Sequence, residues 1–326
     1  MKKTAILLFS LLALTACGDS EAEKTAASTK KSDTQKTTAT SEDTVSSASV
    51  KQDVEVAKVT WNTIPKEGLI SGNYYRMSER FRQGHEGILE VVVKDDKLEY
   101  IYFNEYTRPN YYNRYFQDVS KRMSEYNISM KEAKGAAWIE GVLLAEEQMT
   151  EKQSLTEDVD TVSGASNSVE QALVPMAKKL NEKIVPSKDF DGPTFYQLTK
   201  DLGDGIYGIL KVVIEDKKIT DLHYDEVFST DPDKITEEKF KRFASLSKYD
   251  SVEYDEASRI GFNVQMDALT EQIKKNQDML NIEGLPATEN TGDYKSSGYT
   301  ERNPAWDNYL SLAEEIQNTA KKDGKL

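Results

Sequence analysis

A chain of 326 residues with a net charge of −14 is long enough for two domains, and its surplus of carboxylates disfavours nucleic acids and anionic surfaces as ligands. Cys17 is the only cysteine, and the two histidines, His85 and His223, do not have the spacing of metal ligands. Disulfides within the chain are therefore excluded, and no metal-binding residues are assigned. Redox chemistry would have to come from an organic cofactor or from a metal held by carboxylates.

The N-terminus has the features of a secretory signal peptide. Lys2 and Lys3 precede an apolar run, Ala5–Ala13, that is too short for a transmembrane span. The following Leu14-Thr15-Ala16-Cys17 resembles a bacterial lipobox, which implies cleavage after residue 16 and lipidation of the Cys17 thiol. The alternative is an ordinary secretory cleavage that leaves Cys17 free. We expect residues 1–16 to be a lipoprotein signal peptide and Cys17 to anchor the mature protein.

The segment after Cys17 has the composition of a disordered tether. Gly18–Val50 consists of small, polar and charged residues without an aromatic residue, so it cannot bury enough apolar surface to fold. About 33 such residues span roughly 30 Å as a coil and about 110 Å when fully stretched. We therefore assign residues 17–58 to the lipidated cysteine and its linker, which would let a domain reach away from the membrane.

The remaining chain carries an internal repeat. Each copy has a strand, a short charged turn and a second strand, which predicts a β-hairpin. Helical patterns follow each hairpin without regular strand–helix alternation, so we expect an α+β fold with an antiparallel sheet and packed helices. We expect two tandem domains, 59–187 and 188–326. The paired strands are Gly87–Val93 with Leu98–Phe103 and Gly208–Ile214 with Ile219–Tyr224, and the copies continue to Glu105 and Glu226.

Two of the helix starts are predicted from local signals. Ser129 with Glu132 has the spacing of a capping box, which predicts that a helix of the first copy begins there. Asn303-Pro304 predicts the start of the last helix, because proline is favoured in the first turn.

The segment Asp160-Thr161-Val162-Ser163-Gly164-Ala165-Ser166 precedes a helical pattern with one apolar face. Ser168 and Gln171 fit a capping box that starts this helix just after Ser166, and Pro175 predicts a kink within it. A hydroxyl in front of a helix start lies where backbone N–H groups favour an anion, and Gly164 leaves room for close approach. Taken alone, these residues favour an ordinary Ser-Gly turn before a capped helix.

The pattern Asp-x-x-Ser/Thr-Gly-Ala-Ser/Thr resembles the flavinylation motif of FMN-binding domains, and every defined position is filled. The resemblance implies that a flavin transferase joins the FMN phosphate to the Ser166 hydroxyl as a phosphoester; the family has threonine there more often. It also implies that Asp160, Ser163, Gly164 and Ala165 belong to the cofactor-binding segment. Serine has the free hydroxyl that a phosphoester requires.

The second copy has Asp293–Thr300 where the first copy has the motif. The Gly-Ala-Ser/Thr sequence is missing, and Tyr299 stands at the acceptor position in an ungapped alignment. A one-residue insertion would instead place Thr300 there, without a preceding alanine. We expect this copy to be degenerate for covalent attachment, so that one FMN is carried per chain. Its alternative roles are non-covalent flavin binding, docking of a partner or shielding of the first domain.

The order of lipobox, tether and tandem FMN-binding domains resembles the PplA-type flavinylated lipoproteins of extracellular electron transfer in Gram-positive bacteria. The resemblance implies an electron carrier rather than an enzyme, lipid-anchored on the extracellular face of the cell membrane. Its implied partners are the flavin transferase, a membrane quinol-oxidising dehydrogenase and an extracellular electron acceptor. It also implies a peptide pheromone released from the signal peptide. The alternative function is that of a solute-binding or adhesive surface lipoprotein.

Overall fold

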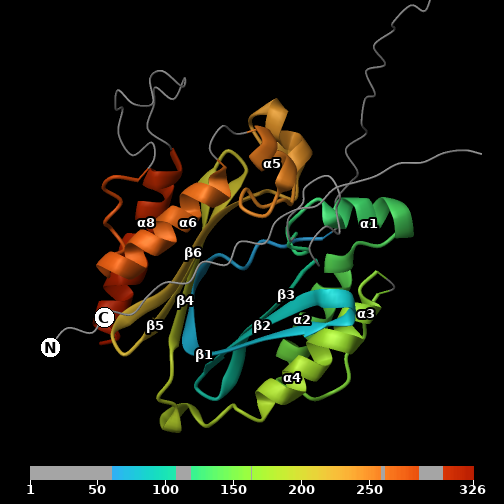
Figure 1. Cartoon of the computed structure of the whole chain (residues 1–326), viewed down its shortest axis with the longest axis horizontal. Coiled ribbons are helices and arrows are strands. Elements are labelled where there is room, and N and C mark those ends of the chain that lie inside the picture. Colours follow the sequence, from blue (N-terminus) through green and yellow to red (C-terminus); the bar gives the residue numbers. More distant parts are fainter. Residues whose placement is uncertain (1–60, 108–118, 163, 258–260, 286–303) are drawn as a thin grey trace, which may run out of the picture. The chain divides into compact units, whose positions relative to one another are not determined.

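Six antiparallel strands form a sheet in the order β3-β2-β1-β4-β5-β6 (Figure 1). The computed structural model describes residues 61–107, 119–162, 164–257, 261–285 and 304–326, all of them in the unit Val54–Leu326. The signal peptide, Cys17, the tether, Ser163 and the segment Asp293–Thr300 lie outside the described residues. The strands are β1 Gly68–Phe81, β2 His85–Lys94, β3 Lys97–Tyr106, β4 Thr194–Gly203, β5 Ile206–Glu215 and β6 Lys218–Phe228.

The two predicted hairpins are confirmed as β2–β3 and β5–β6. Their turns contain residue pairs at positive φ: 50° and 64° at Asp95 and Asp96, and 50° and 60° at Asp216 and Lys217. Two consecutive positive φ angles define the tight turn whose twist matches that of the flanking strands. Both hairpins also shift register at the same relative position, between Val92 and Val93 in one and between Val213 and Ile214 in the other. This shared irregularity is the mark of a duplicated unit.

Strands β1 and β4 join the two copies in the middle of the sheet. They pair antiparallel, with Ser71 opposite Tyr196. We call β1–β3 with α1–α4 the first half, and β4–β6 with α5, α6 and α8 the second half. The sheet is continuous across the predicted boundary at residue 187, and the fold is mixed α+β.

The helices cover one face of the sheet. In the first half α2 contacts β3 and α4 contacts β1, while in the second half α6 contacts β6 and α8 contacts β4 and β5 (Figure 1). Directly opposed residues of antiparallel strands point to the same face, so the register of Ser71 and Tyr196 places Tyr75 and Tyr196 on one face. Each tyrosine belongs to the apolar core beneath its own helices. The helices are α1 Tyr126–Lys134, α2 Trp138–Lys152, α3 Ser166–Ser168, α4 Val174–Asn181, α5 Val252–Ala257, α6 Phe262–Asn276 and α8 Pro304–Lys322.

Helices α2 and α6 occupy matching places in the two halves. Each has 15 residues, begins with an aromatic residue and ends at a glutamine with positive φ, Gln153 or Gln277. The Gln153 side chain bonds both backbone groups of Leu98 at 2.8 and 3.0 Å, and Gln277 bonds those of Ile219 at 2.7 and 3.0 Å. These equivalent anchors align the helices residue by residue.

Both capping boxes predicted from the sequence are wrong. Ser129 lies inside α1, which ends at Gly135 with φ 76°, and the next helix is capped by Glu140, whose carboxylate accepts the Ala137 N–H at 2.8 Å. Ser168 is the last residue of α3, without a capping bond from its side chain, although α3 does begin next to the predicted position, at Ser166. The capping pattern spans only three residues, so it cannot distinguish a helix start from a serine within the first turns.

The helix after the motif is irregular where Pro175 led us to expect a kink. A π-helical turn, Val169–Leu173, connects α3 to α4, and Pro175 follows it at the start of α4. Proline has no N–H to donate to the preceding turn, which favours a widened turn there. The last helix begins at Pro304, as predicted. None of the helices in the described segments is long and apolar enough to cross a membrane.

Candidate functional site

The motif segment forms a tight turn that leads directly into a helix. The Ala165 N–H donates to the Val162 carbonyl at 2.9 Å, and the Ala165 carbonyl accepts the N–H groups of Ser168 and Val169, each at 2.9 Å. Ser166 is the first residue of α3 and is half-buried. Its hydroxyl makes no hydrogen bond to the described residues, so its oxygen is available to another group.

Two glycines allow the turn to lie close against the α1–α2 region. A Cβ atom on Gly164 would lie 2.9 Å from the carbonyl oxygen of Ala136. A Cβ atom on Gly141 of α2 would lie 2.6 Å from the Ala165 Cβ and 2.7 Å from the Thr161 Oγ1. Ala165 is completely buried against this helix. The Gly-Ala pair of the motif is therefore required by packing, and Gly141 is its partner.

Asp160 is held through its backbone rather than its side chain. The side-chain amide of Gln148, on α2, donates to the Asp160 carbonyl at 3.1 Å and accepts its N–H at 3.0 Å. The Asp160 residue itself is exposed. The structure thus brings Asp160, Gly164, Ala165 and Ser166 into one ordered turn on α2.

A cavity of about 280 Å³ opens beside the turn; we call it the motif cavity. Gly164, Asn167 and Ser168 form one part of its wall, and these residues precede and follow Ser166 in the sequence. Three cationic side chains line it against a single carboxylate, in a protein whose net charge is −14. This local surplus of positive charge favours an anionic ligand. The remaining lining residues are Phe81, Arg82, His85, Glu105, Lys121, Tyr126, Met130, Lys134 and Trp138.

A buried charge cluster forms part of this wall. Lys121 Nζ contacts Glu105 Oε1, and His85 Nδ1 lies 3.3 Å from the same oxygen. Burial lowers the pKa of the Lys121 ammonium, and Glu105 opposes that shift. The Lys121 ammonium also lies 4.8 Å from the ring centre of Tyr126 and 5.9 Å from that of Trp138. The cation is therefore surrounded by π faces and one carboxylate rather than by water.

The second half has the same charge pair but a larger side chain at the helix position against which the motif packs in the first half. Lys248 and Glu226 form an ion pair at 2.6 Å, and Lys248 N–H donates to the Glu226 carbonyl just as Lys121 N–H donates to that of Glu105. At the position of Gly141, α6 carries the buried Gln265. A side chain of that size would fill the space that Ala165 occupies in the first half.

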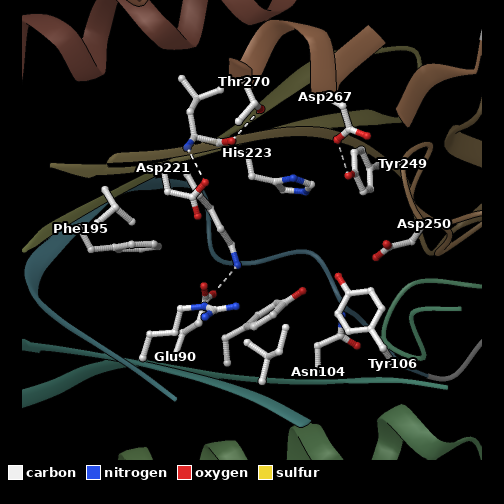
Figure 2. Close-up of a pocket in the computed structure, with 16 residues that line it drawn as sticks. Glu90, Asn104, Tyr106, Phe195, Asp221, His223, Tyr249, Asp250, Asp267 and Thr270 are labelled. Carbon is white, nitrogen blue, oxygen red and sulfur yellow. Dashed lines mark hydrogen bonds and ion pairs between the residues drawn. The ribbon is translucent and has the colours of Figure 1, made fainter. Parts of the chain in front are cut away.

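A second cavity, about 240 Å³, lies on the face of the sheet opposite the two apolar cores, and Asp267 and Thr270 of α6 also line it; we call it the central cleft (Figure 2). Side chains of the first half, including Glu90, Asn104 and Tyr106, face His223 and Asp221 of the second half. Glu90 and Lys211, at corresponding positions of the two hairpins, form an ion pair at 3.0 Å across it. Burial alone would raise the pKa of Glu90, but Lys211 and the Tyr74 hydroxyl hold it below its ordinary value.

Two titratable groups that line the central cleft, Asp250 and His223, have strongly shifted pKa values, and so does Asp225 beside them. Burial, with repulsion from Asp250, raises the pKa of Asp225 to about 8, although Ser247 Oγ donates to its carboxylate at 2.5 Å. Burial also raises the pKa of Asp250 to about 6, and Ser120 of the first half donates to it at 3.0 Å. Burial lowers the pKa of His223 to about 4. Within the segments that the structure describes, no group of three or more His, Cys, Asp or Glu residues could hold a metal ion.

No protein-family profile matches the chain, and no curated protein matches it. Among solved structures, the CPE2226 protein of Clostridium perfringens is 26% identical over 38% of this chain and 87% of that protein, with a TM-score of 0.24. At that TM-score the likeness supports no statement about fold or function.

Sequence reasoning identified the turn but not its surroundings. It placed Asp160, Gly164, Ala165 and Ser166 in one segment, while Ser163 and Cys17 lie outside the described residues. It missed the residues that hold or line the site, which come from other elements. One signal was present: a glycine inside a predicted helix, such as Gly141, often marks close packing. The others that were missed are Arg82, Lys121, Lys134, Trp138 and Gln148.

Proposed function

We propose that this protein is a lipid-anchored flavoprotein that carries electrons on the extracellular face of the cell membrane. The observation that carries the proposal is the packing of the motif turn, with Gly164 against Ala136 and Ala165 against Gly141, beside a cationic cavity. An ordinary Ser-Gly turn needs no glycine on the facing helix and no surplus of cations next to it. Both features fit a segment that must present Ser166 in one conformation.

The residues around the turn fit the roles that covalent FMN requires. The Ser166 oxygen would hold the FMN phosphate, and Arg82 and Lys134 would offset the negative charge of the resulting phosphodiester. The exposed carboxylate of Asp160 suits recognition by a flavin transferase rather than contact with the buried cofactor. When bound, FMN supplies the redox chemistry, and the protein supplies position and charge.

We assign the two halves to tandem FMN-binding-type domains, 59–187 and 188–326, that share one sheet. The duplicated hairpins and the matching helices α2 and α6 support this division. The second domain would be degenerate, because Gln265 occupies the place of Gly141 and the motif is incomplete in the sequence. One FMN per chain follows from this assignment.

The proposals for the lipid anchor and for the partners rest on the sequence alone. Cys17 would carry the lipid, and the tether 18–50 would let the flavin domain collide with more than one partner. Electrons would come from a membrane quinol-oxidising dehydrogenase and pass to an extracellular acceptor, without nucleic acid as a ligand. We retain release of a peptide pheromone from the signal peptide as part of the same proposal.

Flavin fluorescence in a denaturing gel tests the attachment site. Ser166→Ala should abolish the fluorescent band, because alanine keeps the turn but has no acceptor oxygen, whereas Ser166→Thr should retain it. Circular dichroism of both variants controls for folding. Fluorescence that survives in Ser166→Ala would place the flavin elsewhere and contradict the proposal, with Thr300 the first alternative.

The central cleft favours a second candidate, a solute-binding lipoprotein. It is lined by charged and aromatic groups from both halves, as many small-molecule sites are (Figure 2). The two functions differ in a simple property of the native protein. Material purified from a strain that contains the transferase would be yellow if it is a flavin carrier and colourless if it only binds a solute.

A further inference from the structure

Two buried polar atoms in the wall of the motif cavity have no partner among the described residues. They are Glu105 Oε2, an acceptor, and Trp138 Nε1, a donor. Each of these two residues is only 1% exposed. Buried polar groups in folded proteins are almost always hydrogen-bonded, so two unpartnered atoms in one cavity indicate a ligand that supplies both bonds.

Lys121 adds a second donor to the same wall. Its ammonium has three N–H groups and contacts Glu105 through Oε1, which leaves Glu105 Oε2 for another donor. The contact with Lys121 also fixes the Glu105 carboxylate in place. The cavity thus presents one acceptor together with two donors, on side chains that are nine-tenths buried or more.

We propose that Glu105, Trp138 and Lys121 form a receptor for the pyrimidine edge of the flavin ring. Glu105 Oε2 accepts the hydrogen bond of the ring N3–H, and Trp138 Nε1 and Lys121 Nζ donate to the carbonyl oxygens that flank it. This assignment rests on the proposed function, in which FMN is the ligand of the motif cavity. A plain anion would satisfy the donors but has no hydrogen to offer Glu105.

The second half lacks this receptor even though it keeps the ion pair. Glu226 Oε1 accepts hydrogen bonds from Tyr224 at 2.8 Å and from Asn308 at 2.9 Å. The helix position of Trp138 is taken by Phe262, whose side chain has no N–H group. The two halves therefore differ at equivalent glutamates. Glu105 has a carboxylate oxygen left for a ligand, whereas the carboxylate of Glu226 is hydrogen-bonded by protein side chains.

Ligand binding to the full-length Ser166→Ala protein tests the receptor without covalent attachment. The probes are riboflavin and 3-methylriboflavin, which differ only at the hydrogen that Glu105 would accept. Riboflavin should bind at least tenfold more tightly, because the methyl group leaves a buried carboxylate oxygen unpaired. Equilibrium dialysis at constant salt gives both dissociation constants.

A single substitution tests the indole donor. Trp138→Phe, made in the same Ser166→Ala background, should weaken riboflavin binding about tenfold because it removes one hydrogen bond and keeps an aromatic ring. Trp306→Phe is the matched control, since it removes an indole N–H from the core of the second half and should leave riboflavin affinity unchanged. Thermal unfolding of each variant shows whether it is folded.

Equal affinity for the two flavins would overturn the receptor, and this comparison needs no change at Trp138. The receptor would also be overturned if neither flavin bound, or if the Trp138→Phe and Trp306→Phe proteins had equal affinity for riboflavin. The proposed function fails on a different measurement, the covalent flavin of the protein with Ser166 intact. Failure of the receptor and failure of the proposed function can therefore be distinguished.

Discussion

Adding one methyl group to α2 should impair flavin attachment from outside the motif. Gly141→Ala places a Cβ atom 2.6 Å from the Ala165 Cβ and 2.7 Å from the Thr161 Oγ1, closer than carbon atoms approach in proteins. Such overpacking costs about 1–3 kcal/mol, while alanine gains about 1 kcal/mol over glycine in helix propensity. The expected net loss of unfolding free energy is thus about 1 kcal/mol. The motif turn would have to move by a few tenths of an ångström or more to relieve the contact.

Flavin content and stability should respond unequally to this change. Since misplacement of a reacting group on the order of 1 Å can cost about a hundredfold in rate, the yield of in-gel flavin fluorescence should fall well below that of the parent. Gln265→Ala, at the equivalent position of α6, is the control and should leave the yield unchanged. Gly141→Ala combined with Ala165→Gly should recover part of it. Full flavinylation of Gly141→Ala at unchanged stability would refute the argument that packing on α2 shapes the motif.

Three further changes test other parts of the account. Cys17→Ser should release the protein or leave its precursor uncleaved, as judged by membrane fractionation; a processed, membrane-bound variant would exclude lipid anchoring. Asp225 has its pKa raised to about 8 in the folded state, so unfolding removes a bound proton above pH 4, and the contribution of Asp225 to stability should fall by up to about 1.4 kcal/mol per pH unit towards pH 8. Asp225→Asn should make the free energy of unfolding, measured with urea at pH 5–8, less dependent on pH. An unchanged pH dependence in this variant would argue against a raised pKa of Asp225. Deleting most of 18–50 should slow reduction of an external acceptor in cells at constant flavin content, and an unchanged rate would mean that the tether does not limit collisions.

The hairpins were predictable because their signals are local. Alternating apolar residues, a charged two-residue turn and β-branched side chains all lie within one stretch of about 20 residues. The Asp95-Asp96 turn takes the positive φ angles that such hairpins require. The helix starts were less predictable, because Gly135 divides one predicted helix into two and Glu140, rather than Glu132, caps the second.

The pairing of β1 with β4 could not be read from the sequence. It joins residues more than 120 positions apart and depends on how two copies of one unit meet. A repeat predicts two similar folds, but it does not say whether they share a sheet. The central cleft follows from that pairing, so the contact of Glu90 with Lys211 could not have been anticipated either.

The motif turn was predicted from its own residues, whereas its setting depends on tertiary contacts. Gly141 and Gln148 belong to α2, and Lys121 comes from the segment before α1. No spacing rule links these positions to Ser166. Of the residues around the turn, only Glu105 is marked in the sequence, because the repeat carries Glu226 at the matching position. That match indicates a feature shared by both halves, such as the ion pair, and not the unpaired oxygen that is found in the first half.

The intact mass of the native lipoprotein, purified from a strain that contains the flavin transferase, tests the central claim most directly. The account predicts the mass of the lipidated chain plus that of one FMN less one water, and the loss of that increment in Ser166→Ala. A native protein without the increment would contradict the assignment as a flavin carrier. An increment of two would show that the second half is also flavinylated and that the one-flavin assignment is wrong.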